Sequence, residues 1–68
     1  MTVASQVKQT IATLKGIEST LELYSIKSHN EDEKSTYRNS LERTNDIIDD
    51  LEKRLKDLEY EEPQYKGF

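Results

Sequence analysis

The chain has 68 residues, no cysteine, one histidine and a formal net charge of −4 at pH 7. At this length one core rarely supplies more than about 3–5 kcal/mol, so small folds add disulfides, metals or oligomerisation. The absence of cysteine excludes disulfides, thiolate metal sites and thiol nucleophiles, and it leaves oligomerisation as the stabilising device. The acidic balance disfavours nucleic acid as a partner, because phosphate contacts need Lys and Arg.

The first predicted helix runs from about residue 2 to residue 27. Its apolar residues recur at steps of three and four, which places them on one side of an α-helix. This first stripe is Val3, Val7, Ile11, Leu14, Ile17, Leu21 and Tyr24. Gly16 lies close to the stripe and has three interpretations: a tolerated surface glycine, a close helix–helix crossing, or a hinge.

A short turn over residues 28–30 precedes the second helix. Either Ser28 with Glu31 or Asn30 with Glu33 fits the reciprocal capping pattern of a helix start. The three consecutive carboxylates that begin at Glu31 would lie at the positive end of the helix dipole. They lack the alternating ligands, central glycine and distal glutamate of a calcium-binding loop, so we expect capping and no metal.

The second predicted helix runs from about residue 31 to residue 61. Its apolar residues alternate steps of four and three, a heptad rhythm that favours left-handed coiled packing against a neighbour. This second stripe is Tyr37, Leu41, Thr44, Ile48, Leu51, Leu55 and Leu58. Ile47 widens the stripe, as expected for a helix that touches two neighbours in a bundle.

The two predicted helices differ in charge. Residues 30–62 hold 12 acidic and 6 basic side chains, whereas the first helix has three lysines, two glutamates and many Thr and Ser. The nearly neutral first helix is therefore the better candidate for the inner or the partner-facing side.

Residues 63–68 form a predicted tail, because Pro63 disfavours α-helical geometry at the residue before it. Three interpretations stay open: a frayed end, a segment that packs over the mouth of the hairpin, or a docking peptide for another protein. Tyr65 and Phe68 are the candidate docking residues in the last two cases.

Together these elements predict an all-α fold. Residues 1–62 form a hairpin of two long antiparallel helices, which completes a four-helix bundle by dimerisation. The predicted interface consists of Val7, Ile11, Leu14, Ile17, Leu21, Tyr24, Tyr37, Leu41, Ile48, Leu51, Leu55 and Leu58.

The sequence lacks the residue patterns that a catalytic, cofactor-binding or metal site would need. His29 stands alone, and the residue three positions before it is Ile26, so the Glu-x-x-His motif of di-iron bundles fails. The only glycines are Gly16 and Gly67, which excludes a glycine-rich phosphate loop. We therefore expect no catalytic residues, no cofactor and no metal. The sequence has no apolar run of the ~18 residues that would span a membrane, and its N-terminal residues do not form a secretory signal. We therefore expect a cytoplasmic protein.

The segments Met1–Gly16 and Glu61–Phe68 resemble domain-of-unknown-function family 1657, short uncharacterised proteins of endospore-forming Firmicutes. The resemblance implies a small soluble protein whose gene lies beside those of the SpoVA spore channel, in operons linked to spore heat resistance and slow germination. It also implies a place in the forespore or spore core, next to the inner membrane, with a spore membrane protein as partner. The family has no established catalytic residues.

The leading functional hypothesis is a non-enzymatic protein-interaction module that self-associates, with a dimer favoured. An alternative is a peripheral membrane adaptor that binds a membrane protein or lipid through the first helix or through Tyr65 and Phe68. A third is a chain that stays largely disordered until it meets its partner.

Overall fold

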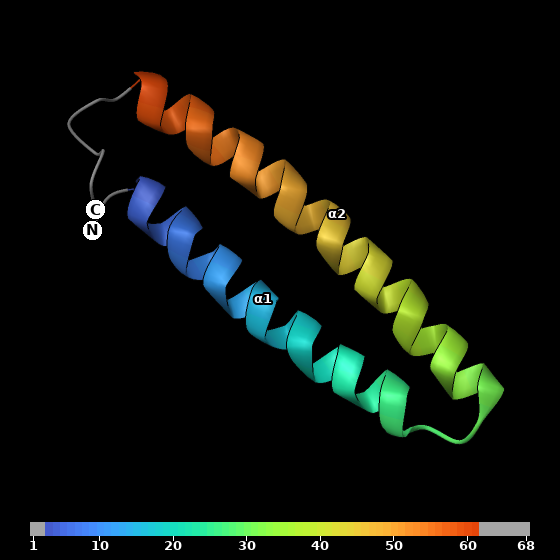
Figure 1. Ribbon diagram of the computed structural model, residues 1–68. Coiled ribbons are helices and arrows are strands. Elements are labelled where there is room, and N and C mark those ends of the chain that lie inside the picture. The colour runs from blue at the N-terminus through green and yellow to red at the C-terminus, as the bar shows by residue number, and fades with distance from the viewer. Residues whose placement is uncertain (1–2, 62–68) are drawn as a thin grey trace.

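Two antiparallel α-helices lie side by side along their whole length in the computed structural model, which describes residues 3–61 (Figure 1). Helix α1 spans Val3–Lys27 and helix α2 spans Glu31–Glu61, and no strand occurs within the described residues. The hairpin measures 49 × 16 × 13 Å. The predicted all-α helical hairpin is confirmed.

The turn is held by a series of hydrogen bonds that link the end of α1 to the start of α2. The Ser28 N–H donates to the Tyr24 carbonyl at 3.0 Å and so ends α1. The Asn30 side-chain oxygen accepts the N–H groups of Asp32 at 2.8 Å and Glu33 at 3.3 Å and so starts α2. The Ser28 hydroxyl donates to the Glu33 carboxylate at 3.0 Å and accepts the Asn30 N–H at 3.4 Å. Asn30 is therefore the cap, but the Glu33 carboxylate reaches the hydroxyl of Ser28 instead of the N–H of Asn30.

The inner side of α2 follows the second stripe. Every residue of that stripe is buried or half-buried, and Ile48 in its middle is only 2% exposed. A period of 3.5 residues keeps one line of side chains facing a neighbouring helix, and here that neighbour is α1.

The inner side of α1 is offset from the first stripe. Its inward residues are Ala4, Val7, Ile11, Leu14, Glu18, Leu21 and Ser25, all buried or half-buried at alternating steps of three and four. Val3, Ile17 and Tyr24 belong to the first stripe but are 53%, 46% and 50% exposed. We call the inward residues of the two helices the seam. The regular steps of the seam place Ala4, Glu18 and Ser25 on the inner side. The apolar pattern had instead predicted the residue directly before each of them to face inward.

The hairpin encloses a thin core. Among the described residues the buried apolar side chains are Ala4, Ile11 and Ile48, and no large side chain is completely buried. Gly16 is exposed, and a Cβ added there would meet nothing within 4 Å. Gly16 is thus a surface position in the hairpin and does not mark a close crossing between α1 and α2.

Candidate functional site

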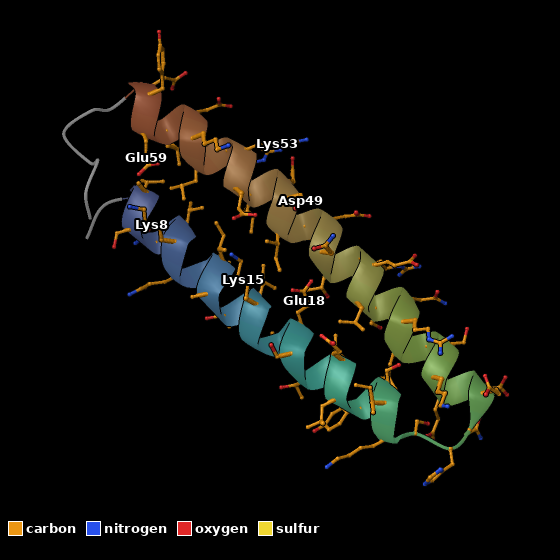
Figure 2. The ribbon with its side chains drawn as sticks, in the orientation of Figure 1. Lys8, Lys15, Glu18, Asp49, Lys53 and Glu59 are labelled. Carbon is orange, nitrogen blue, oxygen red and sulfur yellow. The ribbon has the colours of Figure 1, made fainter. Side chains whose placement is uncertain are left out.

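The two long flanks of the seam differ in chemistry. On one flank the Lys8 ammonium lies 3.3 Å from the Glu59 carboxylate, at the open end of the hairpin (Figure 2). Further along, the Lys15 ammonium lies 3.6 Å from the Glu52 carboxylate. Each of these four residues directly follows a seam residue in its own helix, so the four lie on the same side of the antiparallel pair. We call this side the ion-pair face.

The opposite flank carries exposed apolar side chains. Val3, Ile17, Tyr24 and Ile47 each directly precede a seam residue, which places them on the side away from the two lysines. We call this side the apolar face. Ile47 is 51% exposed, close to the values of the three α1 residues. Exposed large apolar side chains that share one face indicate a contact surface.

The apolar face is anchored at the turn end by a pair of aromatic rings. The ring centroids of Tyr24 and Tyr37 are 5.8 Å apart, and the ring planes are tilted by 54°. Tilted pairs at this separation are favourable contacts between aromatic side chains. The contact holds Tyr24 against α2 and leaves half of its surface exposed.

A groove of about 310 Å³ opens near the other end of the hairpin. Its apolar lining comes from Val7 of α1 and from Leu51 and Leu58 of α2, and its charged lining comes from Arg54, Asp57 and Glu61. Arg54 directly precedes the seam residue Leu55, so the groove opens toward the apolar face.

The described residues offer this surface no metal site and no membrane-spanning helix. No group of three or more His, Cys, Asp or Glu side chains within residues 3–61 is placed to hold a metal ion. No helix in that range is long and apolar enough to cross a membrane. What the apolar face and its groove can do physically is bury apolar surface against another chain.

The outer hydroxyls of α1 are satisfied within the helix. The side chains of Thr10, Thr13, Ser19 and Thr20 each donate to the carbonyl four residues earlier, at 3.0–3.2 Å. Such side chains can be covered by a partner without leaving an unpaired donor.

The predicted interface residues separate into three groups. Ile11 and Ile48 are buried inside the seam, and Ile17 and Tyr24 are exposed on the apolar face. Half-buried positions along the seam are taken by Val7, Leu14, Leu21, Tyr37, Leu41, Leu51, Leu55 and Leu58. The candidate docking residues Tyr65 and Phe68 lie outside the described residues.

Three exposed apolar residues were not predicted from the sequence: Leu23, Ile26 and, near the C-terminal end of α2, Tyr60, which is 82% exposed. Leu23 is 47% exposed and Ile26 is 72% exposed, and both lie near the turn end of α1. They fall outside the first stripe, and their spacing of three residues was the available signal that they share the outer side of the helix.

One family matches this chain. A family model with the description "Protein of unknown function (DUF1657)" covers residues 7–55, which include the turn and most of both helices. No curated protein and no solved structure matches the chain.

Proposed function

The chain belongs to the family described as Protein of unknown function (DUF1657), and we propose that it is a non-enzymatic interaction module that self-associates into an antiparallel four-helix dimer. The membership confirms the resemblance drawn from the two ends of the sequence. The family description assigns no activity, so the proposal depends on the geometry of the hairpin.

One observation carries the proposal: the hairpin leaves several large apolar side chains about half exposed and buries very few completely. Val3, Ile17, Tyr24 and Ile47 are each about half exposed, whereas Ile11 and Ile48 are the only large apolar side chains buried among the described residues. Burying apolar surface contributes about 25 cal/mol per Å². A second copy over the apolar face would add the burial that a two-helix unit cannot supply alone.

Solution molar mass and far-UV circular dichroism across a dilution series test the proposal. We expect a dimer whose helicity falls as the mass falls to that of the monomer, because folding and assembly then form one equilibrium. Alanine at both Leu51 and Leu55 should abolish assembly and helicity together. A chain that stays helical and monomeric at every concentration would contradict the proposal.

A second candidate function is a peripheral membrane adaptor. The exposure of Leu23 and Ile26 on α1 supports it, because apolar side chains beside lysines favour a membrane surface. Liposome flotation separates the two candidates. A dimer that satisfies its own apolar face stays in the soluble fraction, whereas an adaptor floats with the vesicles.

The spore context implied by the family resemblance remains a prediction. Expression confined to sporulating cells would support an accessory role at the spore inner membrane, and expression in growing cells would contradict it.

A further inference from the structure

The second copy has a defined place on the hairpin. We infer, on the basis of the self-association proposed above, that it docks on the apolar face with its turn at the same end. Each α2 then packs beside the α1 of the other copy. The reasons are the unequal flanks, the size of the face, the uncharged side of α1 and the charge of the two helices.

The unequal flanks select the face. A copy on the ion-pair face would have to cover the Lys8–Glu59 and Lys15–Glu52 pairs, whose side chains are 25–56% exposed. Desolvating charged pairs costs free energy that their mutual attraction need not return. The apolar face presents Val3, Ile17, Tyr24 and Ile47, each directly before a seam residue, so covering it removes apolar surface from water. It also carries the exposed Asp50–Arg54 pair, but the charges of this face lie on α2 and its α1 half carries none.

The face has the area that a stable dimer needs. The hairpin is 49 Å long and 16 Å wide, so one side has a footprint of about 800 Å². That equals the area per partner of a standard stable interface. Most of the length of both helices must therefore take part, which a copy aligned along the hairpin allows.

The side of α1 toward this face has the pattern of a second seam. Its positions step by three and four residues, as the inner seam does, and none of them is charged. They are Val3, Gln6, Thr10, Thr13, Ile17, Thr20 and Tyr24. The three threonine hydroxyls already donate to carbonyls of α1. A helix of the second copy can therefore pack along this line without burying a charge or an unpaired hydroxyl of α1.

Charge selects which helix of the second copy lies there. Helix α1 holds three lysines and two glutamates, a formal charge of +1, whereas α2 holds eleven acidic and six basic side chains, a formal charge of −5. A copy with its turn at the opposite end would place α2 beside α2. A copy with its turn at the same end places each α2 beside α1 and keeps the two acidic helices diagonal, which reduces repulsion.

The same-end arrangement also fixes a register. A two-fold axis along the hairpin keeps every residue at its own height, so residues that lie level within one copy lie level between copies as well. Tyr24 of one copy then lies near the height of Tyr37 of the other, because the two rings meet within one hairpin.

Distance measurement between turns tests the arrangement. The chain has no cysteine, so the variant His29→Cys carries one spin label at the exposed turn. Packed helices lie 8–10 Å apart, so turns at the same end bring the two labels to within ~20–25 Å. Turns at opposite ends separate them by nearly the 49 Å length of the hairpin. A long distance in a confirmed dimer overturns this inference and leaves the proposed function intact, whereas a monomeric mass overturns both.

A matched pair of variants tests the face. Ile17→Glu places a charge on the apolar face, and Ile26→Glu places the same charge on α1 outside that face. We expect Ile17→Glu to weaken dimerisation at least tenfold, because a carboxylate would be buried without a partner. We expect Ile26→Glu to leave the dissociation constant unchanged. Equal effects of the two variants, or no effect of Ile17→Glu, would overturn the choice of face, and circular dichroism at a fixed high concentration checks that each variant is helical.

Discussion

Neighbouring isoleucines on α2 provide a test of which side of the helix forms the core. Ile48 is 2% exposed inside the seam, whereas Ile47 is 51% exposed on the apolar face. Each Ile→Ala change removes three carbon atoms, and burial contributes about 0.8 kcal/mol for each of them. For Ile48 the loss includes the cavity left behind and reaches about 3 kcal/mol. For Ile47 in the free hairpin, about half of the transfer free energy applies and no cavity forms, which gives about 1 kcal/mol.

Urea denaturation followed by circular dichroism measures both losses. A loss of about 3 kcal/mol could consume most of the stability of so small a fold, so the milder change Ile48→Val keeps the comparison measurable. It removes one methylene group and should cost about 1 kcal/mol, compared with about half of that for Ile47→Val. Equal losses for the two positions at the lowest concentration at which the chain is still helical would refute the seam described above. The Ile47→Ala loss should rise with protein concentration, because the second copy covers that side chain.

Three further changes probe the cap, the ion-pair face and the surface glycine. Asn30→Ala should lower the free energy of unfolding by about 1 kcal/mol, because two N–H groups of α2 lose their acceptor, and Asn30→Gly should cost only a few tenths. Lys15→Ala should cost less than about 1 kcal/mol, since both partners of its pair with Glu52 are about half exposed, and the cost should shrink at high salt. Gly16→Ala should stabilise the hairpin by roughly 0.5–1 kcal/mol, seen as a rise in Tm of several degrees, because a Cβ meets open space there. A loss of stability in Gly16→Ala would instead show that the assembled protein brings another chain close to this position.

The sequence predicted the inner side of α2 more accurately than that of α1. In α2 the apolar residues and the seam share one period, so Ile48, Leu51 and Leu55 could be assigned from spacing alone. In α1 the seam passes through Glu18 and Ser25, and the apolar residues one position earlier face outward. A rule that assigns every apolar residue to the inner side cannot detect this offset, because the offset depends on how α1 packs against α2.

The candidate site was less accessible to sequence reasoning than the fold. The exposure of Ile17 and Tyr24 follows from the offset in α1 and becomes visible only when α2 is in place. The groove beside Val7 combines side chains from both helices, so no local pattern marks it. The difference in charge between the two helices could be counted from the sequence. Using it to orient a second copy required knowing which side of the hairpin the second copy would contact.

The contrast between the helices also bears on where assembly stops. The surface of α2 that points away from both the seam and the apolar face carries exposed charged side chains such as Asp46 and Lys53. Such a surface resists burial, because each charge would lose its hydration. Helix α1 has a second uncharged line of side chains, and pairing by a two-fold axis uses that line once in each copy. In the arrangement proposed above, growth beyond a dimer is therefore disfavoured, since the outer surface of α2 offers no apolar line on which a chain of hairpins could continue.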